Sequence, residues 1–365
     1  MKALIIILLC ITNLSCNKKQ SETKKRIETK VQTNNNDSGL QNVKILKTLF
    51  ITNENGLNFR DSPNGRVLGK LAYGQKVGVI EYSGIENEIE DEGKIIKAEW
   101  YGIKNYKNDE TNKVYVFSSF LGDESKVKLI EESLSVVQGL YSSSSKAFFW
   151  ESGKEVNVDS LLKFEIISKQ SFDQLKTKNI DYINKDKTHV YRVKDTLFVG
   201  NHKFVDDDID NEGYIKHKYI GEIDFLNKYV IFRNLWENAD YILIDKSSGN
   251  IESENTKLIK LAQEQGVNRL GLPRISINKK NMITLEGSIY TKKAELNIFE
   301  IVNNSNLRLK HSLLFKTWSP KEDEIYWISD NEFIVNASPI NVISEWEYGK
   351  TIGSNNYLKI KILNF

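Results

Sequence analysis

The sequence predicts a mainly β protein, in which a small barrel is followed by a larger antiparallel β domain. Apolar and polar residues alternate in short segments over most of the chain, and Gly, Pro, Asn and Asp recur between these segments. The length of 365 residues suggests two domains, and 40% hydrophobic residues suffice to build their cores.

The N-terminal residues 1–15 have the pattern of a signal peptide. Met1 and Lys2 precede an apolar stretch from Ala3 to Ile11, and a small residue, Ser15, follows. Charge, apolar core and small residue come in the order of a secretory signal. The apolar stretch is much shorter than the roughly 20 residues that a membrane-spanning helix needs, so we expect cleavage or anchoring and no span.

A cysteine, Cys16, stands directly after this signal. The pair Ser15-Cys16 resembles the lipobox of bacterial lipoproteins, although Asn13 and Leu14 depart from its usual leucine and small residue. The resemblance implies that Cys16 carries lipid and anchors the protein to a membrane, where each buried methylene contributes about 0.8 kcal/mol. The alternative is an ordinary secretory signal with an incidental cysteine. Because the only other cysteine is Cys10, the mature chain would have no disulfide and no thiol nucleophile.

Residues 16–46 are predicted to form a disordered tether. The stretch from Asn17 to Leu40 is rich in Lys, Asn, Ser and Thr and has almost no large apolar residues, so it cannot bury a core. The residues after Cys16 are basic, unlike acidic export signals, which favours the periplasmic face of the cell envelope over the cell surface. Over the whole chain, 51 basic and 49 acidic residues nearly cancel, so no nucleic-acid partner is expected.

Residues 47–122 are predicted to form the small barrel. Alternation indicates a strand at 57–60, and the sequence Asp-Ser-Pro-Asn-Gly at 61–65 predicts a turn. Apolar residues at 67–71 and 77–80 indicate two further strands. Short strands with frequent turns are typical of a small barrel.

Four segments of this unit resemble the bacterial SH3-like domain family (SH3b, SH3 type 3). They are LNFRDSP at 57–63, VLGKLAYGQKVGVI at 67–80, EWYGIK at 99–104 and VYVFSSFLG at 114–122. The resemblance implies a barrel that binds cell-wall peptides or other proteins outside the cytosol. Two departures are Tyr115, where the family commonly has Trp, and an acidic loop at 86–92, which we expect to extend a hairpin into solvent.

Five aromatic residues of the barrel are candidate ligand-binding residues, because aromatic-lined grooves present flat faces and polar tips to peptides. They are Tyr73, Tyr82, Trp100, Tyr101 and Tyr115. The alternative is that Trp100 and several of the tyrosines fill the core, since a small domain needs every large side chain that it has. Arg60 is expected to be held by its own domain.

Residues 123–146 are predicted to be a helical connector. Apolar residues recur there at three- and four-residue spacing, between a candidate cap and a terminating glycine. These positions are Val127, Ile130, Leu134 and Val137, with Asp123 or Ser125 at the start and Gly139 at the end.

Residues 147–365 are predicted to form the β-rich domain, with one helix at 256–265. Strand-turn-strand segments such as YILIDKSSGNI at 241–251 suggest a propeller of about four or five blades. A twisted sheet or a sandwich explains the same alternation, so both architectures remain open.

The search for catalytic motifs finds none. The four histidines lack metal-ligand spacing, and the chain has no nucleophile elbow and no phosphate-binding loop. Asp206, Asp208 and Asp210 are weak candidates for a calcium site, although a solvated acidic loop explains them better, and neither a metal nor a cofactor is expected.

The sequence therefore predicts a lipid-anchored envelope protein without enzymatic activity. Its barrel would bind a peptide, peptidoglycan or protein ligand, and its β-rich domain would give a second interaction surface. Two alternatives remain open. One is an envelope hydrolase, which needs two carboxylates of the C-terminal domain in one pocket, and the other is a structural component of an envelope assembly.

Overall fold

The fold is described from a computed structural model of the chain. The residues described are 44–91, 93–105, 113–142, 147–149, 156–209, 213–235, 238–251, 270–288, 293–303, 306–343, 345–347 and 350–363. The predicted signal peptide and nearly all of the predicted tether lie outside these residues. Among the helices in the described ranges, none has the length and apolar character needed to cross a membrane.

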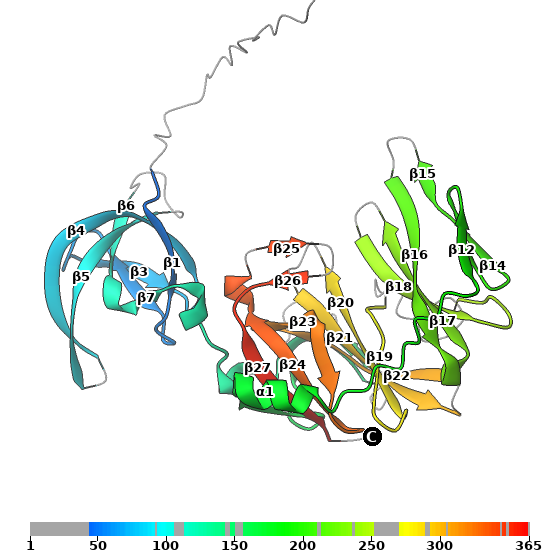
Figure 1. Cartoon of the computed structure of the whole chain (residues 1–365). Helices are drawn as coiled ribbons and strands as arrows, with labels where there is room; N and C mark the ends of the chain where they lie inside the picture. Colours follow the sequence, from blue (N-terminus) through cyan, green and yellow to red (C-terminus); the bar gives the residue numbers. More distant parts are fainter. Residues whose placement is uncertain are drawn as a thin grey trace, which may run out of the picture. The chain divides into compact units, whose positions relative to one another are not determined.

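Residues 47–122 form one curled antiparallel sheet, here called the half-barrel, with strand order β3-β2-β6-β5-β4-β1-β7 (Figure 1). Alternate side chains of these strands fill its core, from Leu49 on the first strand to Val116 on the sixth. The elements are β1 (Lys47–Ile51), β2 (Leu57–Arg60), β3 (Val67–Leu71), β4 (Lys76–Asp91), β5 (Lys94–Lys104), β6 (Lys113–Phe117), the 3-10 turn η1 (Ser118–Phe120) and β7 (Leu121–Gly122).

The local predictions for this unit are confirmed. The strands at 57–60, 67–71 and 77–80 are present, and the turn between the first two closes with a 2.9 Å hydrogen bond from Gly65 N to Ser62 O. Asn64 takes a φ of 58° there, a conformation that Asn tolerates better than most residues. The acidic segment does extend a hairpin, because β4 and β5 stay paired as far as Asp91 and Lys94 and continue beyond the sheet as a two-stranded arm (Figure 1).

The helix predicted between residues 123 and 139 is wrong. The chain instead forms two 3-10 turns, η2 (Glu124–Lys126) and η3 (Glu131–Ser133), and then strand β8 (Val136–Ser142). Asp123 does cap the first turn, accepting a 3.0 Å hydrogen bond from Ser125 N. Residues 123–135, here called the connector, therefore consist of two 3-10 turns, with extended backbone at Val127 and Ile130 between them.

The apolar spacing in the connector arises from burial in two different cores. Val127 packs with Phe50 and Val342, whereas Leu134 and Val137 belong to the main core of the β-rich domain. An α-helix would place all of these side chains on one face, so it would satisfy only one of the two cores.

The β-rich domain consists of antiparallel sheets, as predicted (Figure 1). Their strand orders are β12-β13-β14, β15-β16-β17-β18, β10-β8-β22-β21-β20-β19 with β9 beside β8, β11-β27-β24-β23, and the pair β25-β26. The bounds are β9 (Ala147–Phe149), β10 (Val156–Asn157), β11 (Leu162–Ile167), β12 (Val190–Val193), β13 (Thr196–Val199), β14 (His202–Val205), β15 (Asp207–Ile209), β16 (Gly213–Ile223), the 3-10 turn η4 (Asp224–Leu226), β17 (Lys228–Leu235), β18 (Asn238–Asp245), β19 (Arg274–Ile275), β20 (Asn281–Ser288), β21 (Lys293–Val302), β22 (Asn306–Phe315), β23 (Trp318–Trp327), β24 (Glu332–Pro339), the 3-10 turn η5 (Ile340–Val342), β25 (Glu345–Glu347), β26 (Lys350–Ile352) and β27 (Asn356–Ile362).

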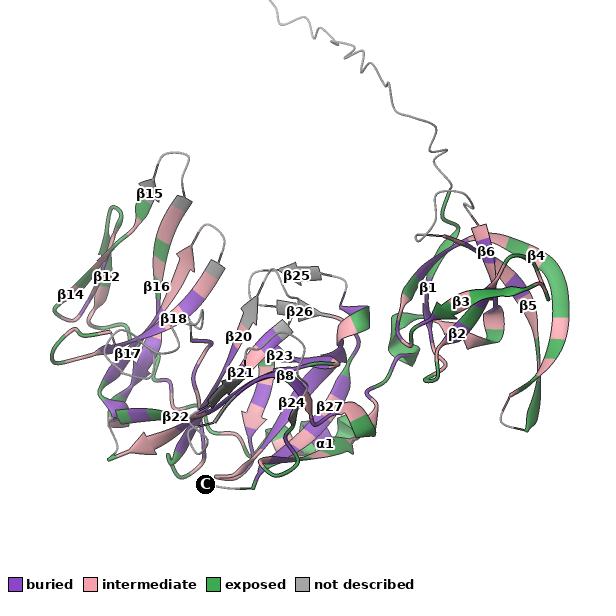
Figure 2. Cartoon of the chain, turned by 180° about the vertical axis from the view of Figure 1, so that it is seen from behind, coloured by how far each residue is buried: buried purple, intermediate pink, exposed green. Residues whose placement is uncertain are grey.

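Successive sheets of this domain pack face to face through three apolar cores. One core joins the β12–β14 and β15–β18 sheets, a second joins the β15–β18 and β19–β22 sheets, and the largest joins β8 and β20–β22 to β11, β23, β24 and β27. Residues at these contacts between sheets are buried, and most residues of strands β24 and β27 are examples (Figure 2). The β4–β5 arm, by contrast, is largely exposed.

One helix of the domain escaped the sequence analysis. It is α1 (Lys169–Lys176), which Ser168 caps by accepting a 3.1 Å hydrogen bond from Ser171 N, and its Phe172 is buried. Only eight residues long, it spans barely two turns, too few for a clear helical period. The helix predicted at 256–265 lies outside the described residues.

Candidate functional site

A pocket of about 340 Å³ lies beside Tyr73, where the half-barrel, the connector and the strand ends around β22–β24 meet within the compact unit Val43–Phe365. Its volume falls in the lower part of the range of roughly 300–1,000 Å³ that is usual for ligand pockets. The lining residues are Ala72, Tyr73, Gly74, Val127, Lys128, Leu129, Ile130, Ser133, Lys316, Thr317, Pro339, Ile340 and Asn341. We call this cavity the Tyr73 pocket.

Tyr73 holds two walls of the pocket together. Its hydroxyl donates a 3.0 Å hydrogen bond to Lys128 O and accepts a 2.6 Å hydrogen bond from Lys128 N. On the other side, Asn341 Nδ2 donates a 2.7 Å hydrogen bond to Tyr73 O. Burial raises the pKa of Tyr73, and the hydrogen bond with Lys128 offsets this only in part, so the phenol stays protonated and keeps its donor.

The connector residues Val127–Ile130 supply an extended edge to the pocket. Val127 has φ −82° and ψ 118°, and Ile130 has φ −100° and ψ 121°, both in the extended region. Leu129 N donates a 3.3 Å hydrogen bond to Asn356 Oδ1, but in the described part of the chain neither Leu129 O nor Ile130 N has a hydrogen-bond partner. These two groups belong to one trans peptide unit and point in opposite directions, so at most one of them can face the pocket.

Trp100, another predicted site residue, is a core residue. It is 3% exposed, lies 5.4 Å from the ring of Phe117, and has the guanidinium of Arg60 5.7 Å from its ring centre. Arg60 also donates a 2.6 Å hydrogen bond to Gly65 O, which ties it to the adjacent turn as expected. Trp100 thus follows the alternative that the aromatic residues fill the half-barrel.

Tyr82 and Tyr101 form a second aromatic group at the base of the β4–β5 arm. Their ring centres are 4.8 Å apart in an edge-to-face arrangement, and Tyr82 is 49% exposed. Burial, together with the nearby Glu99 and Tyr82, raises the pKa of Tyr101. This pair presents aromatic surface to solvent, but it does not line the Tyr73 pocket.

Tyr115 lies in a third place, on the outer face of β6. The ammonium of Lys113 lies 5.1 Å from its ring centre, and Glu81 accepts hydrogen bonds from both residues. The bond from Lys113 to Glu81 raises the pKa of Lys113. The five predicted aromatic residues therefore do not converge on one groove, and only Tyr73 lines the pocket.

Of the three candidate calcium ligands, Asp206 is already paired with other residues. Asp206 accepts hydrogen bonds from Arg192 Nη1 at 2.6 Å, His217 N at 2.8 Å and His217 Nδ1 at 3.2 Å. Burial opposes ionisation of Asp206, but these donors outweigh it and lower its pKa, while burial lowers the pKa of His217. Asp208 pairs through its backbone with Tyr214, and Asp210 lies outside the described residues. Within the described ranges no group of three or more His, Cys, Asp or Glu residues is placed to hold a metal.

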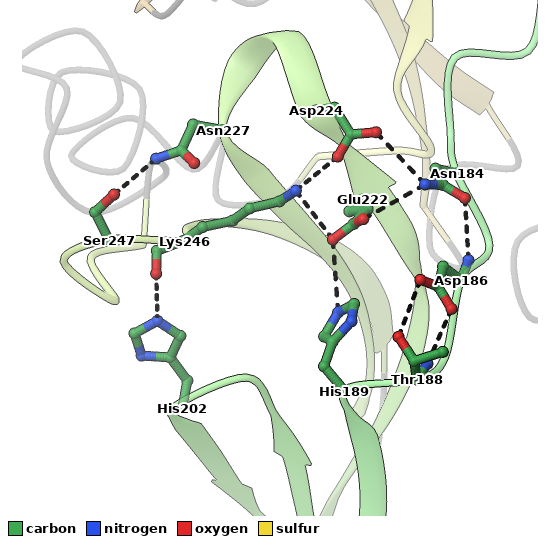
Figure 3. A network of polar contacts seen from close by, with 10 residues as sticks. All are labelled: Asn184, Asp186, Thr188, His189, His202, Glu222, Asp224, Asn227, Lys246 and Ser247. Atoms are coloured by element: carbon green, nitrogen blue, oxygen red, sulfur yellow. Dashed lines mark hydrogen bonds and ion pairs between the residues drawn. The ribbon is translucent and has the colours of Figure 1, made fainter.

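A network of polar residues, absent from the sequence predictions, lies around Lys246 (Figure 3). Lys246 Nζ lies 3.0 Å from Glu222 Oε2 and 2.8 Å from Asp224 Oδ1. Asn184 Nδ2 reaches both carboxylates at 3.5 Å, and His189 Nε2 lies 3.5 Å from Glu222 Oε2. The network joins the segment before β12 to the ends of β16 and β18.

This network is built to hold charges in place. Burial alone would lower the pKa of Lys246, but its bonds to Asp224 and Glu222 raise it, and the same lysine lowers the pKa of Asp224. Lys246 therefore stays a cation, unsuited to nucleophilic attack. Its two carboxylate partners, Glu222 and Asp224, lie more than 20 residues away in sequence, and no local motif links them to it.

The comparisons with known proteins leave the chain without an assigned family. No protein-family model matches it, and no curated protein matches it either.

Proposed function

We propose that the protein is a lipid-anchored component of the bacterial cell envelope that binds a peptide ligand in the Tyr73 pocket. Cys16 would carry the anchor, on the resemblance of Ser15-Cys16 to a lipobox. The observation that supports peptide binding is the pocket itself, which combines a volume of about 340 Å³ with an extended backbone edge.

The chemistry of the pocket suits a short extended segment. A ligand segment beside Val127–Ile130 would pair with one group of the Leu129–Ile130 peptide unit, either Leu129 O or Ile130 N, because the two groups of a trans peptide point in opposite directions. Its side chains would contact apolar walls that include Ile130, Pro339 and Ile340. Because the pocket is small, the proposal implies recognition of a few residues.

The β-rich domain would supply a second interaction surface. On the outer face of the β12–β14 sheet, Tyr191 and Phe198 stack with ring centres 4.7 Å apart. Tyr191 is 55% exposed, and Val193 and Val205 on the same face are 53% and 56% exposed. Single exposed apolar residues are common on protein surfaces, but these side chains lie together on one face. Such a group favours contact with a partner.

A variant that fills the pocket tests the binding site. Ile340→Trp places a large ring among the lining residues, and Ile95→Trp is the matched control on the arm, where Ile95 is 76% exposed. Peptides released from the bacterial envelope would be passed over each immobilised mature protein and the retained species identified by mass spectrometry. We expect retention by the native protein and the control but not by Ile340→Trp. Equal retention by all three proteins would place binding elsewhere.

The anchor is tested separately by the intact mass of the protein from a membrane fraction. A mass that begins at Cys16 with added acyl chains is expected, and Cys16→Ala should lose both the acyl mass and the membrane association. An unmodified mass with another start would leave a secreted protein without the anchor.

A further inference from the structure

A row of buried polar side chains crosses one face of the sheet that contains β20, β21 and β22. Thr284 lies directly opposite Asn297, which in turn lies opposite Ser312 on the next strand. These three residues, here called the Asn297 row, are 0%, 2% and 4% exposed. Asn, Ser and Thr are mostly exposed in proteins, so three of them buried side by side require a reason.

The Asn297 row lies between an apolar core and a pair of glutamates. Side chains on one face of a strand recur at every second residue, so Met282 and Phe299 follow the row in one direction. Both belong to the core that joins this sheet to the β15–β18 sheet. In the other direction lie Glu286 and Glu295, which are directly opposite each other and half-buried. The row therefore has a closed apolar end and a charged end that reaches solvent.

Three polar atoms of the row have no hydrogen-bond partner among the described residues. They are Asn297 Nδ2, Asn297 Oδ1 and Thr284 Oγ1, and all three are buried. Ser312 differs, because its hydroxyl donates a hydrogen bond to Glu295. Buried donors and acceptors are nearly always paired in native proteins, since an unpaired one costs free energy. The unpaired atoms of Asn297 and Thr284 therefore point to a ligand that pairs with them.

The unpaired atoms define the chemistry of this ligand. The amide of Asn297 needs both an acceptor and a donor, and the hydroxyl of Thr284 can act as either. Burial raises the pKa of Glu295, and its carboxyl group can bond a hydroxyl in either protonation state. A metal ion would match Asn297 Oδ1 but would leave the donor Nδ2 unpaired. Neighbouring hydroxyl groups both donate and accept, so they satisfy the whole amide.

We propose that this face of the sheet binds a sugar through Asn297, Thr284 and Glu295. Directly opposed residues have Cβ atoms about 4.5–5.5 Å apart, and Glu295 is the next residue on the same face of β21, so one sugar ring can reach all three. Glu286 takes part in another interaction and is assigned no contact with the sugar. The site shares no residue with the Tyr73 pocket and takes a different class of ligand.

The test follows binding to the mature full-length protein by saturation-transfer NMR. Glucose, galactose, mannose and ribose are the sugar probes, and cyclohexanol is the control, a ring with a single hydroxyl. At least one sugar should bind at least about tenfold more tightly than cyclohexanol, because only a sugar offers neighbouring hydroxyls to Asn297. Binding of none of the four sugars, or of cyclohexanol as tightly as the best of them, overturns the proposal.

Two variants locate the sugar in the Asn297 row. Asn297→Leu nearly keeps the volume of the side chain and removes both unpaired atoms, so it should weaken binding at least about tenfold without loss of stability. Thr284→Val removes the third unpaired atom and should also weaken binding, which keeps the test valid if the first variant fails to fold. Asn306→Leu changes an exposed Asn of β22 outside the row and should bind as the native protein. Thermal unfolding of each variant controls for folding.

The remaining outcomes separate this proposal from its alternatives. Native binding by folded Asn297→Leu and Thr284→Val would place the sugar elsewhere and overturn the proposal. Calcium chloride is the cation probe, and if it displaces the sugar and loses its own binding in Asn297→Leu, the row is a cation site and the proposal is wrong. Ile340→Trp should leave sugar binding unchanged, so failure here and failure of peptide binding in the Tyr73 pocket are distinguishable.

Discussion

His311 should make the stability of the protein depend on pH between neutral and mildly acidic conditions. This histidine of β22 is 4% exposed, and both of its ring nitrogens are buried without a hydrogen-bond partner among the described residues. Burial, helped by the nearby Lys310, lowers its pKa to about 4 from a usual value of 6.5. At pH 7 the folded protein therefore contains a neutral imidazole.

The size of the effect follows from the difference between the folded and unfolded pKa values. Between pH 6.5 and 4 the unfolded chain binds a proton at this site and the folded chain does not, so stability falls as the pH falls. The contribution is fully present above pH 6.5 and is lost towards pH 4. At 1.36 kcal/mol for each unit of pKa difference, the total loss is about 3 kcal/mol.

The replacement His311→Leu removes the titrating group and should remove this part of the pH dependence. At pH 7 the variant should be as stable as the native protein or more stable by about 1 kcal/mol, since it no longer buries unpaired polar atoms. Urea unfolding of both proteins at pH 7, 6, 5 and 4 measures the difference directly, because all other titrations are shared. If the two free energies of unfolding fall in parallel, the reasoning is refuted.

Three further changes have expected outcomes of their own. Lys246→Met should destabilise the protein by about 2 kcal/mol in urea unfolding, because it leaves Glu222, whose side chain is 11% exposed, without the ammonium of Lys246. An unchanged unfolding midpoint would mean that Lys246 does not stabilise the charge of Glu222. Thr284→Val should change the free energy of unfolding by less than about 1 kcal/mol, since the hydroxyl of this fully buried residue has no hydrogen-bond partner in the described part of the chain; a loss of about 2 kcal/mol or more would mean that the hydroxyl does form a hydrogen bond. Trp100→Ala should cost about 3–5 kcal/mol, measured by thermal or urea unfolding, and a mild loss would mean that the half-barrel does not depend on this ring.

The elements predicted well are those whose cause is local. The turn at 61–65 follows from residues that set their own backbone angles, and the neighbouring strands follow from alternation over four or five residues. The arm was also predicted, because a charged segment between apolar strands cannot be buried in a core and is expected to extend into solvent. In each case the required signal lies within about ten residues.

The candidate site was predicted only in part. Tyr73 was among the five aromatic candidates, but the sequence ranked it no higher than Trp100, which is buried, or Tyr82, which lies on the arm. What distinguishes Tyr73 is its pair of hydrogen bonds to Lys128, a residue 55 positions away. A contact between residues so far apart in sequence produces no recurring pattern of residues in either segment, so the sequence alone does not predict it.

By itself the sequence determined the β character of the chain, its turns and the alternation of its strands, because these depend on steric preferences and on the burial of every second side chain. The tertiary structure alone decided how Val127, Leu134 and Val137 are used. Their spacing suits a helix, but two separate cores bury them, and the chain is extended at Val127 and at Ile130, between two 3-10 turns. The spacing of apolar residues predicts which side chains are buried. Only the arrangement of the cores decides which core buries each of them.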